Sequence, residues 1–438
     1  MKVLLASIPA VGHLNPVLGI GRILIDAGHE VACLSGGFLR DRIESIGAKF
    51  HALPAAADLD PDPMKQFPEA KTISPGLQLL RFALERVFID RMPGQLEGLR
   101  QVLRDFPADV IIGDQLMLGT FPMLLGPRSK RPAIVLLGTS YLIWRRDDGA
   151  PNEAGIPPAS NEAQREEYAA LFKESEAAVF GPAGRHLNNL LAALGVGPVS
   201  MNLYDAIVSL PDAYLQLTVP SFELPRRNLP ANVHFVGPLP IVPNQAPLPP
   251  WAHELDGSRR VVLLTQGTLT TYNFNELVVP TLAALADEPD VLVMVTARGR
   301  SIDAIPGPIP SNARLASYLP FEWALSKADA FVTNGGYGSV NQALSFGVPI
   351  VAAGALADRG DVNVRVAWSG VGVNLATNAP TSEALRLAIR DVLDKPNYRS
   401  RATEMAKEFS RIDTRSEILR ILEQVSQASE KERGLRIA

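Results

Sequence analysis

AFVTNGGYGSVNQAL, residues 330–344, joins a short apolar run to three glycines and then to a helical pattern. The run Ala330–Val332 predicts a buried strand, and the residues after the glycines predict a helix. Glycine lets a backbone adopt unusual φ angles and approach a ligand closely. The free N–H groups at a helix start, together with the helix dipole, suit a diphosphate. Taken alone, the pattern also fits a tight strand-to-helix turn in any α/β protein.

The alternation of strand and helix continues on both sides of this turn. In the second half, apolar runs predict strands at 260–265, 291–296, 313–317, 330–333 and 349–353, and residues 381–427 are strongly helical. The first half predicts strands at 2–8, 30–35, 49–53, 109–114 and 132–137, with helices at 14–28 and 39–47. Apolar strands that alternate with helices indicate parallel sheets with right-handed crossovers. We therefore predict an α/β fold of two doubly wound domains.

A proline-rich segment separates the two halves. Nine prolines lie between residues 219 and 250, a composition typical of an extended linker. We predict an N-terminal domain at 1–225, a linker at 226–250 and a C-terminal domain at 251–438 that ends in closing helices. Ligands of open α/β sheets bind at the carboxyl ends of the strands, so the two domains are expected to enclose a cleft.

The composition narrows the class of protein. The 438 residues carry a net charge of −4, with 47% hydrophobic and 20% charged residues, which indicates a globular protein and argues against a nucleic-acid partner. The single cysteine, Cys33, lies in an apolar run and excludes an internal disulfide framework. No Cys–His spacing suggests a metal site, and no apolar stretch reaches the ~20 residues of a membrane span. We expect a cytoplasmic protein without a prosthetic group, in which Arg145 and Arg146 provide at most a weak peripheral membrane contact.

An ordered series of short motifs extends from residue 318 to residue 372. It comprises Tyr318-Leu319-Pro320, Asn334-Gly335-Gly336-Tyr337-Gly338-Ser339, Gln342, Gly347-Val348-Pro349, Asp358-Arg359, Asn363 and Gly370-Val371-Gly372. Elsewhere in the chain stand Gly12-His13-Leu14-Asn15-Pro16 and Gln266-Gly267-Thr268. Together these motifs resemble family 1 glycosyltransferases, which have the two-domain GT-B fold and take a sugar from a nucleotide diphosphate. The resemblance covers most of the chain and is weakest in the middle insertions, where acceptors bind.

The resemblance implies a donor site that lies mainly in the C-terminal half. Its residues are Gly12, Thr268, Tyr318, Leu319, Asn334, Gly335, Gly336, Gly338, Ser339, Gln342, Asp358 and Arg359. By the resemblance, the glycines, Ser339 and Thr268 hold the diphosphate, and residues 318–321 border the nucleobase. Gln342 binds the ribose, and Asp358 with Arg359 contacts the hydroxyls of the sugar.

Four positions depart from the family pattern. Asn334 replaces a histidine that commonly touches a phosphate, and Gln342 replaces a glutamate. Arg359 and Phe321 each replace a glutamine. An amide still donates a hydrogen bond but carries no charge. The departures keep the diphosphate site plausible, and they leave two choices open: UDP or dTDP as the nucleotide, and glucose or a deoxysugar such as rhamnose.

His13 is the candidate catalytic base, and Asp114 is its candidate partner. Of the six histidines, His13 is the one between the first predicted strand and the first predicted helix, at the carboxyl edge of the sheet. Histidine titrates near neutrality and can take the proton from an acceptor hydroxyl. Asp114 ends the strand at 109–114, where it can accept the second imidazole N–H and orient the ring. The alternatives are a histidine that only packs in the turn and an aspartate that only caps a helix.

These residues predict an inverting transfer that needs no metal ion. His13 deprotonates the acceptor hydroxyl as it attacks the anomeric carbon, through a transition state of oxocarbenium character. The glycine-rich helix start stabilises the departing diphosphate. The acceptor is expected to be small and largely apolar, and Phe82, Phe88, Tyr141 and Trp144 are the candidate residues of its pocket.

Three other functions stay open on the sequence. A nicotinamide or flavin oxidoreductase would need Gly-x-Gly-x-x-Gly after the first strand, where residues 9–13 read Pro-Ala-Val-Gly-His. A nucleotide-sugar epimerase of the same fold would turn over the donor without an acceptor. A nucleotide-sugar binder that has lost catalysis is suggested by Asn334 and Gln342, although His13 and Asp114 are intact.

Overall fold

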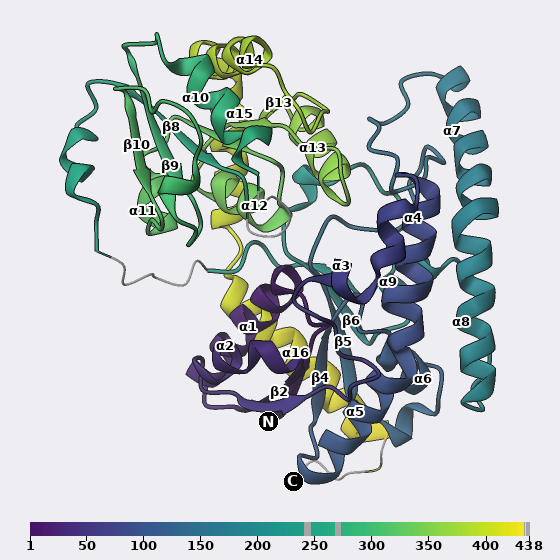
Figure 1. Ribbon diagram of the computed structural model, residues 1–438. Helices are drawn as coiled ribbons and strands as arrows, with labels where there is room; N and C mark the ends of the chain where they lie inside the picture. The colour runs from purple at the N-terminus through teal and green to yellow at the C-terminus, as the bar shows by residue number, and fades with distance from the viewer. Residues whose placement is uncertain (241–246, 268–272, 433, 435–438) are drawn as a thin grey trace.

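The structure is a computed structural model that describes residues 1–240, 247–267, 273–432 and 434. It consists of two α/β domains, each built on a parallel sheet flanked by helices (Figure 1). Strands of such sheets are buried on both faces, which explains why the apolar runs of this sequence are nearly continuous. The prediction of two doubly wound α/β domains is confirmed.

The N-terminal sheet of the described chain has seven parallel strands in the order β3-β2-β1-β4-β5-β6-β7. They are β1 (Lys2–Ala6), β2 (Glu30–Ser35), β3 (Lys49–Ala52), β4 (Val110–Asp114), β5 (Ala133–Gly138), β6 (Ala213–Gln216) and β7 (Val233–Phe235). The accompanying helices are α1 (Val11–Asp26), α2 (Arg40–Glu44), α3 (Pro63–Gln66), α4 (Leu77–Phe82), α5 (Met92–Asp105), α6 (Phe121–Leu124), α7 (Glu162–Ser175), α8 (Gly181–Ala193) and α9 (Leu203–Ser209).

The C-terminal sheet of the described chain has six parallel strands in the order β10-β9-β8-β11-β12-β13. They are β8 (Arg260–Thr265), β9 (Val291–Thr296), β10 (Ala313–Ala316), β11 (Ala330–Thr333), β12 (Ile350–Ala352) and β13 (Gly372–Asn374). The helices are α10 (Val278–Leu285), α11 (Phe321–Lys327), α12 (Tyr337–Ser345), α13 (Arg359–Trp368), α14 (Ser382–Asp394), α15 (Pro396–Ser410) and α16 (Thr414–Glu432).

All the strands predicted from apolar runs are present, and three further strands, β6, β7 and β13, were not predicted. These three contain three or four residues each, but the predicted strands β3, β10, β11 and β12 are equally short, so length alone does not explain the difference. β7 also lies among the prolines of the segment predicted as a linker. Hydrogen bonding to β6 recruits it into the N-terminal sheet, a tertiary effect that local composition does not show.

The chain crosses between the domains more than once. Because β7 belongs to the N-terminal sheet, that sheet includes residues up to Phe235. α16 returns from the C-terminal domain and packs on the N-terminal domain (Figure 1), where Arg128 donates to the Ser429 hydroxyl at 2.7 Å. The division at residues 225 and 250 stays a prediction, and the final helix of the predicted C-terminal domain supports both domains.

α1 begins at Val11, three residues before the predicted start. The N–H groups of His13 and Leu14 both donate to the carbonyl of Ala10, which closes the first turn. Pro16 therefore lies inside the helix, where it lacks the N–H that would bond the carbonyl four residues earlier. His13 is part of the first helical turn and not of the preceding loop.

Both sheets have a topological switch point at an equivalent place. β1 and β4 are neighbours in the N-terminal sheet, and β8 and β11 are neighbours in the C-terminal sheet. In the N-terminal sheet, the chain adds β2 and β3 on one side of this pair and β5, β6 and β7 on the other side. In the C-terminal sheet, it adds β9 and β10 on one side and β12 and β13 on the other. The loops that leave such a pair diverge and open a crevice at the carboxyl edge, where ligands bind. We call these places the N-terminal and the C-terminal switch point.

Candidate active site

His13 and Asp114 meet at the N-terminal switch point. The Nδ1 atom of His13 lies 3.1 Å from Oδ1 of Asp114. The His13 side chain is 23% exposed, whereas the Asp114 side chain at the end of β4 is fully buried. With its proton on Nδ1, the imidazole donates to the carboxylate and keeps the Nε2 lone pair for a substrate proton. The geometry suits a base whose orientation is set by a carboxylate.

The Asp114 carboxylate is fixed by backbone donors. The Ile8 N–H donates to Oδ2 at 2.6 Å, and the Leu116 N–H donates to Oδ1 at 2.8 Å. A buried carboxylate needs such partners, because its charge has lost the hydrogen bonds of water. The bond to Ile8 also ties the segment before α1 to the end of β4, so the same carboxylate helps to place His13.

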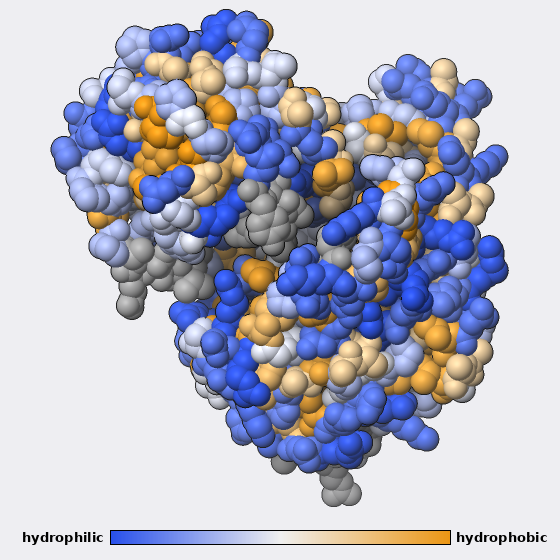
Figure 2. Space-filling model, in the orientation of Figure 1, coloured by the Kyte–Doolittle hydropathy of each residue, from blue (hydrophilic) through white to orange (hydrophobic). Residues whose placement is uncertain are grey.

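Two consecutive residues after β5 connect the candidate catalytic pair to the candidate donor site. The Thr139 hydroxyl lies 3.1 Å from Nδ1 of His13, and the Ser140 hydroxyl donates to Oδ2 of Asp358 at 2.5 Å. Consecutive Cα atoms are about 3.8 Å apart, so the candidate base and the candidate sugar-binding carboxylate both contact one short segment. The surface is hollowed where the two domains meet (Figure 2). The sequence analysis missed both hydroxyls, although they directly follow a buried strand at the same carboxyl edge.

The glycine-rich turn at the C-terminal switch point requires glycine at residue 335. Gly335 has a φ of 95°, and a Cβ there would lie 2.0 Å from Oδ1 of Asn363. Asn363 is fully buried, and its Nδ2 donates to the carbonyls of Gly354 at 2.9 Å and Asn334 at 3.4 Å. Asn363 thereby fastens the turn to the end of β12, and any larger residue at 335 would displace it.

The start of α12 offers donors for an anion. Gly336 is the N-cap residue, so the N–H groups of the first turn have no partner within the helix. The Ser339 hydroxyl donates to the Gly336 carbonyl at 2.9 Å. Apart from the adjacent residues and the backbone of α12 itself, no described atom lies within 4 Å of a Cβ built on Gly338. Gln342 is half-buried and lies one helical turn beyond Gly338 and Ser339, on the same face.

Asn334 makes a structural hydrogen bond in addition to any ligand contact. Its Nδ2 donates to the carbonyl of Gln266 at the end of β8. The Gln266 side chain in turn donates to the Asn273 carbonyl at 2.7 Å and accepts from the Val278 N–H at 3.3 Å. Asn334 therefore joins the two strands of the C-terminal switch point. Thr268, the predicted phosphate contact, lies outside the described residues.

The remaining predicted donor residues differ in accessibility. Tyr318 is 53% exposed, whereas Leu319 is 2% exposed and packs in the core, so Leu319 can offer a ligand only its backbone. Asp358 is the N-cap residue of α13, and Arg359 begins the helix. Burial lowers the pKa of the Arg359 guanidinium. Gly12 lies in the first turn of α1, beside His13.

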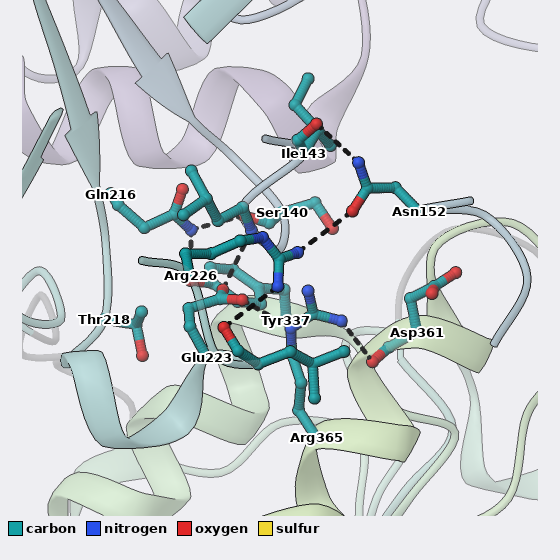
Figure 3. A network of polar contacts seen from close by, with 12 residues as sticks. Ser140, Ile143, Asn152, Gln216, Thr218, Glu223, Arg226, Tyr337, Asp361 and Arg365 are labelled. Carbon is teal, nitrogen blue, oxygen red and sulfur yellow. Dashed lines mark hydrogen bonds and ion pairs between the residues drawn. The ribbon is translucent and has the colours of Figure 1, made fainter. Parts of the chain in front are cut away.

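A buried polar network joins the two domains (Figure 3). Arg365 of α13 forms an ion pair with Glu223, which follows β6, at 2.6 Å, and their side chains are 1% and 3% exposed. The Gln216 side chain donates to the hydroxyl of Tyr337 at 2.5 Å. The Gly155 N–H donates to Oδ1 of Asp361 at 3.2 Å. These contacts connect the first residue of α12 and the core of α13 to the N-terminal domain, so they hold the two switch points in a defined relation.

The four residues predicted to bind the acceptor belong to two different apolar clusters. Phe82 is half-buried in a small apolar cluster, and Phe88 packs on the main core. Tyr141 is 4% exposed, and the Arg365 guanidinium lies 4.5 Å from its ring centroid. Trp144 donates from its indole N–H to a backbone carbonyl at 2.8 Å. Tyr141 thus contributes to the contact between domains, and acceptor binding by this set stays a prediction.

A cavity of about 90 Å³ lies within the N-terminal insertions. Its lining includes Asn152, Glu153, Phe172, Ser175, Phe180 and Tyr204. Burial raises the pKa of Glu153, whose carboxylate accepts a hydrogen bond from Ser175. None of the four predicted acceptor residues belongs to this lining.

The basic pair Arg145–Arg146 does not form an exposed patch. Arg146 is 6% exposed and forms an ion pair with Asp148 at 2.7 Å, so the suggestion of a membrane contact through both arginines is wrong. The described parts of the chain contain no helix with the length and apolar character to cross a membrane. In the same ranges, no group of three His, Cys, Asp or Glu side chains is placed to hold a metal ion.

The chain is similar in sequence and in fold to known glycosyltransferases and biosynthetic proteins. Residues 279–425 match the model of the erythromycin biosynthesis protein CIII-like C-terminal domain. The 4'-demethylrebeccamycin synthase of Lentzea aerocolonigenes is 35% identical over 417 residues, which cover 94% of this chain and 96% of that protein. UDP-glycosyltransferase 2 of Phaeomoniella chlamydospora is 36% identical over 439 residues, with coverages of 97% and 96%. The solved structure of the spinosyn rhamnosyltransferase SpnG complexed with thymidine diphosphate is 19% identical and has a TM-score of 0.69, over 97% of this chain and 100% of that chain.

Two doubly wound domains of this kind are the GT-B architecture, which the similar solved glycosyltransferase structure shares. The chain belongs to family 1 of the glycosyltransferases. The predicted family, fold and enzyme class are confirmed, and the oxidoreductase alternative is excluded. The roles of the individual site residues stay predictions, for which the structure supplies positions.

Proposed function

We propose that this glycosyltransferase moves a sugar from a UDP- or dTDP-sugar to a hydroxyl of a small, largely apolar acceptor, with inversion and without a divalent cation. One observation carries the proposal: Thr139 contacts His13 while the adjacent Ser140 contacts Asp358. A base and a carboxylate suited to sugar hydroxyls are thereby within reach of a single donor molecule.

The similar proteins support the classes of donor and acceptor. One is named a UDP-glycosyltransferase, and another is the synthase of a natural product. The rhamnosyltransferase structure contains thymidine diphosphate. We therefore infer that the acceptor is a natural product or a similar small molecule, while UDP or dTDP, and glucose or a deoxysugar, remain alternatives for the donor.

The proposed chemistry assigns one role to each switch point. Nε2 of His13 accepts the proton of the acceptor hydroxyl while its oxygen attacks the anomeric carbon. Asp114 stabilises the imidazolium that forms. The bond from the anomeric carbon to the diphosphate breaks on the opposite side, and the N–H groups at the start of α12 stabilise the leaving group. A single displacement inverts the anomeric centre, so an α-linked donor gives a β-glycoside.

The experiment that tests this function combines a donor panel with an acceptor panel. The purified protein is incubated with UDP-glucose or dTDP-rhamnose and with phenolic or alcoholic aglycones, and the products are analysed by mass spectrometry and NMR. The expected result is a glycoside whose anomeric configuration is opposite to that of the donor, such as a β-glucoside from α-linked UDP-glucose, at a rate that EDTA leaves unchanged. Donor turnover without acceptor would favour an epimerase, and nucleotide binding without turnover would favour a non-catalytic binder. A product that retains the anomeric configuration would contradict the mechanism.

A further inference from the structure

Arg298, directly after β9, lacks the partners that a half-buried guanidinium normally has. Its Nε atom is buried without a hydrogen-bond partner. In the described parts of the chain, its side chain forms no hydrogen bond or ion pair, and its guanidinium lies 5.2 Å from the ring centroid of Phe321. Burial lowers the pKa of Arg298. Buried charges in proteins are generally paired. We therefore expect a bound ligand to supply the hydrogen-bond partner of the Arg298 guanidinium.

The backbone holds Arg298 in an unusual conformation. Its φ is 53°, in the left-handed region that favours glycine. The neighbouring residues Ala297 and Gly299 donate to the carbonyls of Ala316 and Ser317 at 3.0 and 2.6 Å. Those two carbonyls belong to consecutive residues, so Arg298 is an extra residue in the ladder, as in a β-bulge. Bulges next to binding sites redirect a side chain, and strained backbone of this kind concentrates at functional sites.

The position of Arg298 in the sheet indicates which part of a nucleotide it faces. Arg298 follows β9, the glycine turn follows β11, and Asp358 follows β12, with β8 between β9 and β11. Two strand spacings separate β9 from β11, about 10 Å. The base, the diphosphate and the sugar of a donor can therefore lie in this order along the carboxyl edge. The exposed Tyr318, which follows Ser317, lies at the same end as Arg298.

We propose that Arg298 recognises the nucleobase by donating to the O4 carbonyl that uracil and thymine have and cytosine lacks. The inference rests on the proposed use of a UDP- or dTDP-sugar and adds the residue that selects the base. The guanidinium presents several N–H donors in a rigid plane and has no acceptor. It therefore satisfies a carbonyl oxygen and opposes the amino group that cytosine has at the same position.

The test compares UDP, dTDP and CDP, which share the diphosphate and differ in the base. Isothermal titration of the full-length protein should show UDP or dTDP binding at least about tenfold more tightly than CDP, the order of effect of a hydrogen bond to a charged group. In Arg298→Met the affinity for UDP should fall to near that for CDP, while the affinity for CDP changes little. Arg260→Met is the matched control, because Arg260 is exposed at the opposite edge of the same sheet, and this variant should keep the preference.

The outcomes separate this inference from the proposed function. Absence of UDP and dTDP binding in the wild type would refute the proposed function itself. Equal wild-type affinities for UDP and CDP, or an unchanged preference in Arg298→Met, would overturn the role of Arg298. An equal loss of affinity for UDP and for CDP in Arg298→Met would indicate that the guanidinium contacts the diphosphate, which both nucleotides share. This result would also overturn the role of Arg298 in base recognition. Arg298→Met should melt close to the wild type without nucleotide, since no described hydrogen bond or ion pair is lost and the methionine side chain can still pack on Phe321. If Arg298→Met fails to fold, Arg298→Gln and the wild-type preference still decide.

Discussion

The N-terminal and C-terminal switch points share one topology and use it in opposite ways. At the N-terminal switch point two side chains, His13 and Asp114, are presented, and backbone N–H groups fix the carboxylate. At the C-terminal switch point the backbone of the glycine turn is presented, and the side chains of Asn334 and Asn363 fix it. The first arrangement suits proton transfer, and the second suits binding of an extended anion.

This contrast has a consequence for substitutions. Where side chains perform the chemistry, a change of one functional group should alter the rate and leave the nucleotide affinity intact. Where the backbone binds the ligand, addition of a single methyl group should alter the affinity. The following predictions test whether the two switch points are separable in this way.

His13→Ala should give the largest effect. Loss of a general base typically costs 10²–10⁴-fold in rate, so we expect kcat to fall by about 10³-fold while the affinity for UDP or dTDP changes less than about threefold. Steady-state kinetics and isothermal titration measure the two quantities. His186→Ala is the matched control, because His186 also contacts an aspartate, Asp90, at 2.6 Å, but from α8. Unchanged turnover in His13→Ala would remove His13 from the mechanism.

Asp114→Asn should reduce kcat by about 10²-fold, because the amide cannot stabilise the imidazolium. The amide oxygen can still accept the Ile8 N–H, so the position of the segment before α1 should be kept, while the amide NH2 group cannot accept the Leu116 N–H. We expect thermal melts to show a modest change and nucleotide affinity to stay close to that of the wild type. Full activity in this variant would mean that Asp114 is only a structural residue.

Gly338→Ala tests the backbone site without disturbing the fold. Apart from the adjacent residues and the backbone of α12 itself, a Cβ at 338 has no described atom within 4 Å, and alanine is the better helix former by about 1 kcal/mol, so the unfolding temperature should not fall. If the diphosphate lies against this turn, the new methyl group should weaken UDP binding by about tenfold. Gly335→Ala is the contrasting variant, because its Cβ would meet Asn363 and both stability and binding should decline. Unaltered UDP affinity in Gly338→Ala would place the diphosphate elsewhere.

Asp361→Asn tests the connection between the two regions and should have the smallest effect. Burial raises the pKa of Asp361 from 3.8 to about 7, against the opposing charge of Arg365. Because the folded state holds this proton more tightly than the unfolded state, the contribution to stability is complete below about pH 4 and is lost as the pH rises to about 7. Relative to Asp361→Asn, the wild type should therefore lose a few degrees of unfolding temperature across that window. Parallel pH profiles in thermal melts would contradict the prediction.

Local sequence patterns mark the residues of the two switch points to different degrees. The order of short motifs identified His13, Asp114 and the glycine turn, because residues at strand ends are marked by the apolar runs before them. It missed Thr139 and Ser140, which also follow a strand, because a hydroxyl residue after a strand carries no distinguishing pattern. Arg298 was not predicted from the sequence, because two structural features distinguish it: a φ of 53° and a buried Nε without a hydrogen-bond partner. Neither feature can be read from the local sequence. The Arg365 guanidinium lies 4.5 Å from the ring centroid of Tyr141, a contact that no local sequence pattern shows, and the predicted acceptor role of Tyr141 stays a prediction.

The sequence by itself determined the two doubly wound domains and the glycosyltransferase family, and it supplied His13 and Asp114 as the candidate catalytic pair. Periodic burial and strand-end motifs are local properties, so they can be read along the chain. Tertiary structure alone decided that β7 joins the N-terminal sheet, that α16 returns to the first domain, and that Glu223 pairs with Arg365, 142 positions away. It also decided which hydroxyls meet His13 and Asp358. These contacts join segments distant in sequence, and their energies depend on burial that exists only once the two domains are packed together.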